Sequence, residues 1–358
     1  MERPAWHTDD FPELRSGPPW VMQEMIEAQP DLLEAIAREA DTAPLGLLLR
    51  VGGPLTVVGC GTSEHAALAV AEILTEAGSK AGSRQAFEAA LMPQEGGGVL
   101  GISHEGGTWA TVEALEAARR AGSATGLITA VAGSRATSEA DGVVVTPLVD
   151  RSWCHTVGYT SPIATGLAIA GRPQAGVVAA LAAAGVERRA AATELAAALA
   201  GSDHLIVIGS GADRIAAREL TLKIEEASHI PTAMRDLETF LHGHLPACDE
   251  RTGLILIEHD RRRAGPRHER GETLLKAASR VGVRSAVIGR TAPDPALAPG
   301  GYVATPSDDR LPAAAEALLA TAPALQWVAH ELAVARGVNP DLIRREQETY
   351  REAAEVHG

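Results

Sequence analysis

The 358-residue sequence is poor in aromatic residues, lysine and cysteine, and each shortage narrows what the protein can be. Phe, Trp and Tyr make up 3% of the residues, so the core must be built from Ala, Leu, Val and Ile. The lysines are Lys80, Lys223 and Lys276 alone, and the net charge is −14. No basic stripe is present, which argues against nucleic acid as a partner. The three cysteines lie far apart in the sequence and match neither a disulfide framework nor the spacing of a zinc site.

Long hydrophobic runs are also missing. The N-terminal stretch MERPAWHTDDFPELRSG has no apolar segment of the kind found in signal peptides, and no later run approaches the length of a membrane span. With 46% hydrophobic and 22% charged residues, the composition is that of a soluble globular protein, and the length suggests two domains. We therefore expect a cytoplasmic protein without a membrane partner. On its acidic surface, an anionic ligand would have to be held by local dipoles.

Two similar blocks follow one another in the sequence. The segment PLTVVGCG at 54–61 is a short apolar run that ends in Gly-x-Gly before a helical pattern, and HLIVIGSG at 204–211 repeats this construction. Further strand patterns lie at 98–103, 124–130 and 142–147, then at 253–258, 285–289 and 302–306, with helical patterns at 108–122 and 272–282. Short, continuously apolar strands alternating with helices favour parallel sheets covered on both faces. We predict an internal duplication of a doubly wound, flavodoxin-like α/β domain.

This interpretation divides the chain into four parts. They are a leader with a helix at about 19–40 (residues 1–44), a first domain (45–185), a second domain entered through an Ala-rich helix at 186–200 (186–335), and a C-terminal tail (336–358). A helix followed by an irregular segment is expected after residue 321.

The stretch ELTLKIEEASHIPTAMRDLETFLHGH, residues 219–244, carries the most chemistry. Glu219, Lys223 and Glu226 are spaced by four and three residues, so their side chains fall on one helix face. A short loop then delivers His242 beside a glycine. Two carboxylates, an ammonium and an imidazole suit the movement of protons on and off a sugar carbon. Spacing alone leaves open a salt-bridged, solvated helix face with an ordinary loop histidine.

The two Gly-x-Gly turns do not match a dinucleotide fingerprint, because GCGTSE and GSGADR both lack the third glycine. A strand that leads through a glycine turn into a helix still presents backbone N–H groups. With Thr62 and Ser63 in the first turn, this site suits a phosphate or a sugar hydroxyl. The alternative is an ordinary N-capped helix.

The loop ISHEGGT, residues 102–108, lies where the second strand of the first block should end. Sheets of this type bind ligands at the carboxyl ends of their strands. Ser103, a flexible glycine pair and Thr108 at a helix start suit an anion cradle, whereas Glu105 would repel a phosphate. A plain turn is the alternative interpretation.

Histidines elsewhere give weaker signals. His155 and Thr156 precede another Ala- and Leu-rich helix, where a lone histidine is often a satisfied structural group. His242 and His244 in HGH have no third ligand at a useful spacing, so we expect no metal site.

Taken together, these motifs resemble the SIS (sugar isomerase) family, and most closely the isomerase half of glucosamine–fructose-6-phosphate aminotransferases. The segment WVMQEMIEAQPDLLEAI is similar to that family's N-terminal helix, GCGTSEHAALA to its GCGTSxHAA loop, and ISHEGGTWAT to ISQSGETADT. The stretch from HLIVIGSGADR to FLHGHL is similar to the second repeat, and HELAVARGVNPD is similar to YHVAVARGTDVD. Several motifs in the right order, over nearly the whole chain, make the resemblance specific.

The resemblance implies roles for these residues. Glu226 matches the base that moves a proton between sugar carbons one and two, and Glu219 and Lys223 match the ion pair around it. His242 matches a ring-opening histidine that enters from the neighbouring subunit, so a homodimer with shared sites is implied. No cofactor is implied. The candidate substrate contacts are Cys60, Gly61, Thr62, Ser63, Ser103, His104, Glu105, Thr108, His155, Thr156 and Glu348.

Three departures from the family pattern qualify the expected reaction. No glutaminase domain precedes the repeats in this sequence, so we do not expect ammonia from glutamine within this polypeptide. The family's C-terminal lysine has no counterpart, and Glu348 stands near its expected position. Glu105 stands where the family has a phosphate-binding serine. Either Glu105 turns away, or an arginine or dipole compensates it, or the substrate carries no phosphate.

The resulting expectation is isomerisation or deamination of a hexose or amino-hexose 6-phosphate through an enediol or enolamine. Two alternatives stay open. The first is an isomerase or lyase for a non-phosphorylated sugar or amino sugar, which Glu105 favours. The second is a non-catalytic sugar-binding sensor on the same fold, although the sequence shows no basic helix-turn-helix segment.

Overall fold

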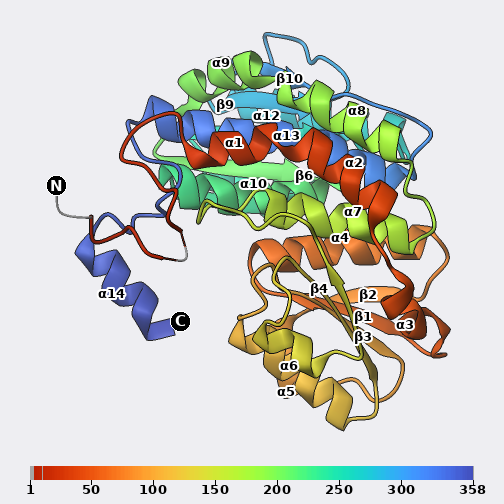
Figure 1. The fold of residues 1–358 in the computed structure, drawn as a ribbon. Helices are drawn as coiled ribbons and strands as arrows, with labels where there is room; N and C mark the ends of the chain where they lie inside the picture. Colours follow the sequence, from red (N-terminus) through yellow and green to blue (C-terminus); the bar gives the residue numbers. More distant parts are fainter. Residues whose placement is uncertain (1–3, 10, 358) are drawn as a thin grey trace.

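Two five-stranded parallel sheets organise the protein in the computed structural model, which describes residues 4–9 and 11–357 (Figure 1). The first sheet has the order β2-β1-β3-β4-β5. Its strands are β1 (Leu55–Gly59), β2 (Ala81–Gln85), β3 (Gly98–Ile102), β4 (Ala124–Thr129) and β5 (Gly142–Val145). This is the expected flavodoxin-like order, with the chain reversing direction between β1 and β3.

Helices cover both faces of the first sheet, as a parallel sheet requires. In Figure 1, α4 (Thr62–Glu76) and α7 (Val157–Ile169) lie on the side toward the second domain, whereas α5 (Ala86–Leu91) and α6 (Trp109–Arg120) lie on the outer side. A 3₁₀ turn, Arg135–Glu139, packs beside α6. Because the sheet is covered on both faces, β3 is buried at all five of its positions.

The second sheet repeats the first, with the order β10-β9-β8-β6-β7. Its strands are β6 (His204–Gly209), β7 (Thr232–Asp236), β8 (Thr252–Glu258), β9 (Arg284–Gly289) and β10 (Tyr302–Ala304). Its helices are α9 (Arg189–Leu199), α10 (Asp213–Ser228), the short α11 (Leu237–Thr239), α12 (Ala264–Arg280) and α13 (Ala313–Ala335). The predicted duplication of a doubly wound domain is therefore confirmed.

Helix α13 ties the two repeats together. It is buried from Ala313 to Ala333, and its residues belong to the hydrophobic cores of both repeats. Its first N–H groups, at Ala313 and Ala314, donate to the carboxylate of Glu76 at the end of α4. A helix that is apolar on all sides is stable only when surrounded by protein. Helix α13 thus fixes the position of the second repeat against the first.

The remaining elements wrap this core. Near the N-terminus lie α1 (Val21–Glu27), α2 (Gln29–Glu39), a 3₁₀ turn (Ala43–Leu45) and α3 (Gly46–Arg50), and α8 (Ala175–Val186) precedes α9. The tail ends in α14 (Glu348–His357), which projects from the body at the lower left of Figure 1. Within the described residues, no helix combines the length and hydrophobicity needed to cross a membrane.

Several expected boundaries are wrong for identifiable reasons. The helix expected at 19–40 is two helices, because Pro30 lacks the N–H that would continue α1 and lies instead in the first turn of α2, which begins at Gln29. The helix expected after residue 321 begins at Ala313, and the tail is helical from Glu348. Strands β2 and β7 were not predicted, because as half-buried edge strands they lack an apolar run. Part of the expected leader, residues 1–3 and 10, lies outside the described residues.

Candidate active site

The polar face predicted for residues 219–226 lies on α10, where the second repeat packs against the first (Figure 1). The ammonium nitrogen of Lys223 is 2.5 Å from Oε2 of Glu226 and 3.8 Å from Oε1 of Glu219. The side chains of Lys223 and Glu219 are 0% exposed, whereas that of Glu226 is 24% exposed. The alternative of a solvated helix face is therefore wrong. One carboxylate of a buried ion group reaches solvent.

Burial and charge act against each other in this group. Burial disfavours the ammonium of Lys223, but the carboxylates of Glu226 and Glu219 outweigh it and raise the pKa of Lys223. Burial raises the pKa of Glu226, while the charge and hydrogen bond of Lys223 limit that rise. The thiol of Cys154 also donates a hydrogen bond to Glu226. The result is a carboxylate that takes up a proton more readily than a free glutamate, beside an ammonium that stays charged.

A cavity of about 500 Å³ opens beside Glu226. The end of α10 and the following turn form one wall, and the tail residues Ile343, Arg344 and Tyr350 form the other. The guanidinium of Arg344 lies 5.0 Å from the centre of the Tyr350 ring and donates a hydrogen bond to its hydroxyl. The tail thus shapes the solvent-facing side of the carboxylate.

Sequence reasoning missed His65, which joins this group from the first repeat. His65 lies in the first turn of α4, and its Nδ1 is 2.7 Å from Oε2 of Glu219. Its side chain is 12% exposed. The sequence does contain His65 within the GCGTSEHAA motif, but no spacing rule links it to a residue 154 positions later.

The first glycine turn supports the expected ligand loop. Gly61 has a φ of 56°, a conformation that glycine adopts freely, and it begins α4 without a side-chain cap. Thr62 is buried and Ser63 is half-buried at the helix start, while the Cys60 thiol contacts the Gln85 side chain at 3.7 Å. Burial raises the pKa of Cys60. A cradle of backbone and hydroxyl groups therefore stands at the carboxyl end of β1.

The neighbouring loop after β3 has a similar form. The hydroxyl of Ser103 donates to that of Thr108 at 3.4 Å, just before α6 begins. Gly106 has a φ of +69°, and a Cβ there would lie 1.9 Å from the Ser134 hydroxyl oxygen, so only glycine fits. Because β3 pairs with β1, this loop and the first glycine turn lie side by side.

His155 connects these loops to α10. Burial, together with the positive charges of Lys223 and His104, lowers the pKa of His155 to about 4, although Asp150 acts in the opposite sense. Its ring centre is 5.1 Å from that of His104. His155 is therefore neutral near pH 7 and close enough to Lys223 to sense its charge.

Two of the candidate contacts serve the architecture instead. The His104 side chain accepts a hydrogen bond from the backbone N–H of Asp150 at 2.7 Å, and burial lowers the pKa of His104. Thr156 is fully buried and donates its N–H to the carboxylate of Asp150 at 2.5 Å. These bonds fix the segment that presents His155.

Glu105 faces positive charge from the tail. Its side chain is 50% exposed, and its carboxylate lies 3.8 Å from Nε2 of His155. The guanidinium of Arg345 lies 4.3 Å from the centre of the Trp153 ring. Burial lowers the pKa of Arg345, and the negative charge of Glu105 opposes this effect. Glu105 is thus within electrostatic range of the Arg345 guanidinium, which is the partner that compensation by an arginine would need.

His242 and Glu348 are not brought to Glu226 within this chain. His242 lies at a kink within the segment Phe240–His244, where its φ of −101° and ψ of 15° are not helical. Its side chain is 76% exposed and is 3.3 Å from the Glu238 carboxylate. Glu348 is exposed at the start of α14. Within the described part of the chain, neither contacts another candidate residue.

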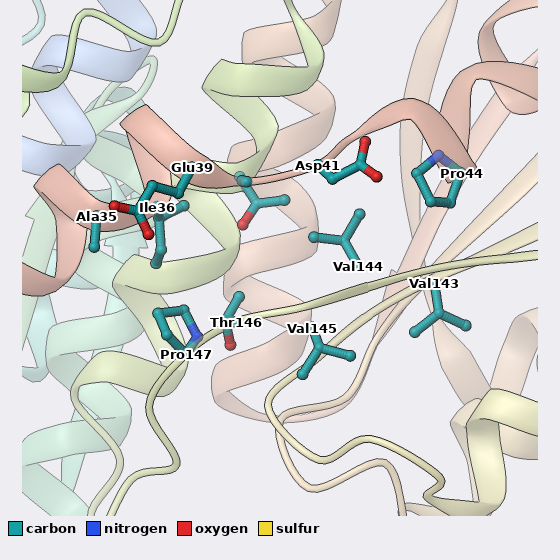
Figure 2. A pocket seen from close by; sticks show the side chains of 12 residues that line it. Ala35, Ile36, Glu39, Asp41, Pro44, Val143, Val144, Val145, Thr146 and Pro147 are labelled. Carbon is teal, nitrogen blue, oxygen red and sulfur yellow. The ribbon is translucent and has the colours of Figure 1, made fainter.

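Another cavity, of about 300 Å³, lies away from these residues. Figure 2 shows its lining, with Ile36, Glu39 and Asp41 on one side and residues 143–147 on the other. None of the candidate site residues lines it. In the described ranges, 4–9 and 11–357, no three His, Cys, Asp or Glu side chains form a metal-binding cluster, and the three cysteines are free thiols.

Comparison with known proteins agrees with this architecture. Residues 198–266, from the end of α9 through β6, α10 and β8 into α12, match the family model of the SIS domain. No curated protein sequence matches the chain.

Solved structures extend the likeness to both repeats. The C-terminal domain of glucosamine-fructose-6-phosphate aminotransferase from Francisella tularensis is 16% identical, with a TM-score of 0.78 over 91% of this chain and 99% of that chain. Tagatose-6-phosphate ketose/aldose isomerase from Escherichia coli is 18% identical, with a TM-score of 0.78 over 93% and 97%. Glucosamine-6-phosphate deaminase from Thermotoga maritima is 19% identical, with a TM-score of 0.70 over 90% and 96%. The predicted fold of two tandem SIS domains is confirmed.

Proposed function

We propose that the protein isomerises or deaminates a hexose or amino-hexose 6-phosphate by moving a proton between C1 and C2. The observation that carries this proposal is the ion group on α10, in which Lys223 and Glu219 are fully buried and Glu226 alone reaches solvent. An ion group with a purely structural role does not require one of its carboxylates to be partly exposed beside a cavity. The sugar-phosphate enzymes among the structural relatives support the same class of substrate.

In this proposal Glu226 is the base. It removes a proton from C2 of the open-chain sugar and returns it to C1, through an enediol or, for an amino sugar, an enolamine. In the second case, protonation at C1 leaves an imine at C2, which water hydrolyses to the ketose with release of ammonia. Because burial raises the pKa of Glu226, this carboxylate takes up a proton more readily than a free glutamate and can then give it back. Lys223 keeps the carboxylate in place and stabilises the negative charge that develops on the sugar oxygen.

The phosphate would bind at the two loops that end β1 and β3. Ser63, Ser103 and Thr108 supply hydroxyl groups there, and the start of α6 adds the positive end of a helix dipole. The Arg345 guanidinium and the His155 ring accompany Glu105 at the edge of this region. Glu105 therefore need not repel the phosphate.

Proton exchange in heavy water tests the reaction directly. Glucosamine 6-phosphate, fructose 6-phosphate and glucose 6-phosphate are incubated with the enzyme beside their unphosphorylated forms, and exchange at C1 and C2 is followed by NMR. We expect exchange with a phosphorylated sugar, lost in Glu226→Gln and kept in Glu225→Gln. Glu225 is a matched control, because it is the adjacent residue and is exposed. Equal exchange by both variants would refute the assignment of Glu226.

A non-phosphorylated sugar is the second candidate, since the Glu105 carboxylate is half exposed beside the expected phosphate site. Exchange with free sugars alone would establish it and make Glu105 a specificity residue. Binding without exchange in either set would indicate a sugar sensor.

In this proposal His242 opens the sugar ring in the site of a second copy of the chain, which its exposure and its contact with Glu238 allow. Mixing Glu226→Gln with His242→Ala chains tests this proposal. In a homodimer with shared sites, statistical mixing restores about a quarter of the wild-type activity, since half the dimers are mixed and each has one intact site. If both residues act within one chain, no activity returns.

A further inference from the structure

We propose that His65 is a positioning residue that holds Glu219, and through Glu219 the ammonium of Lys223, in the arrangement that directs Lys223 at Glu226. This inference rests on the proposed function for its kinetic consequence, but its structural consequence can be measured without any substrate. His65 comes from the first repeat, whereas the other three residues lie on α10 of the second.

The first step of the argument is the contact itself. Nδ1 of His65 is 2.7 Å from Oε2 of Glu219, whose side chain is 0% exposed. A carboxylate only accepts hydrogen bonds, so Nδ1 carries the proton and donates it. Oε1 of Glu219 has no hydrogen-bond partner among the residues that the structure describes. The buried carboxylate therefore depends on His65 for its hydrogen bond.

The second step concerns how Lys223 is shared. Its ammonium is at hydrogen-bond distance from Glu226, 2.5 Å, but at 3.8 Å from Glu219. A buried carboxylate that has lost its donor is costly to leave unpaired. Without His65, Glu219 would draw the Lys223 ammonium toward itself and away from Glu226. His65 thus determines which of the two carboxylates binds the Lys223 ammonium more closely.

The third step is the place of His65 in the fold. It lies in the first turn of α4, directly after the glycine turn 60–63, and its backbone N–H donates to the carbonyl of Gly61 at 3.1 Å. The same helical turn therefore begins at the proposed phosphate loop and ends at the ion group of the base. A shift of the loop on ligand binding would be transmitted to Glu219 by one rigid element.

The elements packed around α10 carry other ionisable groups. From the segment before α7 come Asp150, Cys154 and His155, and from α7 comes Tyr159, which is fully buried. From α4 comes Glu64, paired with Arg218 of α10. From α13 come Glu316, bound by Arg261 and His259, and Glu331, bound by Arg189 and His330. In the part of the chain that the structure describes, none of these groups donates a hydrogen bond to the Glu219 side chain, whereas His65 does.

The direction of the effect follows from these contacts. Lys223 lowers the pKa of Glu226 by its charge and by its hydrogen bond. When Lys223 moves toward Glu219, the pKa of Glu226 rises, so the carboxylate is protonated over a wider range of acidic and neutral pH. The acidic limb of the kcat/KM profile should therefore move to higher pH. Substrate affinity is set by other residues, so kcat falls while KM changes little.

The test compares three variants with the wild type. His65→Ala removes the donor, and His65→Asn keeps an N–H donor near the position of Nδ1. His330→Asn is the matched control, because His330 is a fully buried histidine whose Nδ1 is 2.9 Å from the carboxylate of Glu331. The pH dependence of the Glu226 side-chain carboxyl ¹³C signal, identified by its loss in Glu226→Gln, reports the titration without substrate. Kinetic pH profiles follow once turnover is established.

We expect the titration of Glu226 to move to higher pH in His65→Ala, to stay near the wild type in His65→Asn, and to be unchanged in His330→Asn. An unmoved titration in a folded His65→Ala variant, or an equal shift in His330→Asn, overturns the proposal. If His65→Ala does not fold, a wild-type titration in His65→Gln, whose longer side chain misplaces the donor, overturns it instead. Failure of the proposed reaction would leave these titrations as they are, so the two outcomes are distinguishable.

Discussion

The two repeats share one backbone plan but use it differently at the loops. Gly59 ends β1 and Gly209 ends β6, and at both positions a Cβ would strike the backbone of the helix that follows, at 2.4 Å from the Ser63 carbonyl oxygen and 2.2 Å from the Asp213 carbonyl oxygen. Gly61 and Gly211 then adopt φ values of 56° and 65°. The strand-to-helix turn is thus the same in both repeats, and its side chains are not.

In the second repeat, carboxylates occupy the turns. Oδ2 of Asp213 accepts the N–H groups of His259 and Asp260 at 2.8 and 2.9 Å, and Oδ2 of Asp260 accepts the N–H of Ala212 at 2.9 Å. When Gly59 is aligned with Gly209, Ser63 of the first repeat corresponds to Asp213 and Thr62 corresponds to Ala212. Among the described residues, no acceptor is present for the backbone N–H of Thr62. In the second repeat a carboxylate of the protein itself accepts the N–H at this position, and in the first repeat the proposed ligand would take its place.

The helices after these turns differ in the opposite sense. With the two turn glycines aligned, Glu219 and Lys223 of α10 correspond to Ala69 and Ile73 of α4. Ala69 and Ile73 are buried in the core, at 0% and 1% exposed. The first repeat therefore contributes its loops to the candidate site and the second contributes its helix face. The site exists only where the two meet.

Among the substitutions that test this difference between the repeats, the removal of Lys223 should have the largest effect on stability. Lys223→Met leaves the carboxylates of Glu219 and Glu226 without a cation at a buried position, which should lower the free energy of unfolding by about 3–5 kcal/mol. Adding Glu219→Gln should recover part of the loss, because one of the two unpaired charges is then removed. Urea unfolding measures both variants. A Lys223→Met protein as stable as the wild type would mean that the ion group is solvated.

Asp213 should make the second repeat sensitive to pH. Burial raises the pKa of Asp213 to about 7 in the folded protein, from an ordinary value of 3.8. Between these values the folded state holds a proton that the unfolded state releases, so stability should fall as the pH rises from about 4 to about 7, by at most about 4 kcal/mol.

The neutral variant Asp213→Asn should remove this slope and be the more stable protein at pH 8. Its amide oxygen can replace Oδ2, and its NH₂ group would take the place of Oδ1, which has no hydrogen-bond partner among the described residues. Urea unfolding of both proteins at pH 5 and pH 8 tests the expectation. Parallel pH dependences would show that Asp213 is ionised throughout.

The open cradle of the first repeat should bind phosphate through its hydroxyl groups. Ser103→Ala should weaken binding of a phosphosugar about tenfold, corresponding to the loss of one hydrogen bond to a charged group. Thr305→Ala, at the carboxyl end of the second sheet, is the control, since its hydroxyl is engaged by Nδ1 of His259 at 2.6 Å. Isothermal titration with glucosamine 6-phosphate measures both. Equal weakening would place the ligand in the second repeat.

The smallest effect should come from the paired turn glycines. Gly61→Ala suffers only from its positive φ, costing about 1–2 kcal/mol, because the nearest atom to a new Cβ is 4.0 Å away. Gly211→Ala adds a collision at 1.9 Å with the guanidinium of Arg267, a flexible side chain that must move. Thermal unfolding should therefore rank Gly211→Ala as the less stable variant. The reverse order would mean that the first turn is the tighter one.

Patterns that are local in sequence predicted the fold well. The apolar runs that became β1, β3, β4, β6, β8 and β9 are buried strands, and a buried strand must be apolar on both faces. Strands β2 and β7 were not predicted, because an edge strand is defined by hydrogen bonding to one neighbouring strand and need not be apolar. Pro30 marks the break between α1 and α2 in the sequence, although one continuous helix was expected there.

The sequence by itself determined the duplication, the buried strands and the face of α10 that carries Glu219, Lys223 and Glu226, because helix and strand periodicity are properties of neighbouring residues. Only the tertiary structure decided that this face is buried, that His65 binds Glu219, and that Arg345 accompanies Glu105. These contacts join residues from different repeats or from the tail. No local rule encodes them, because they arise when separate elements pack into one core.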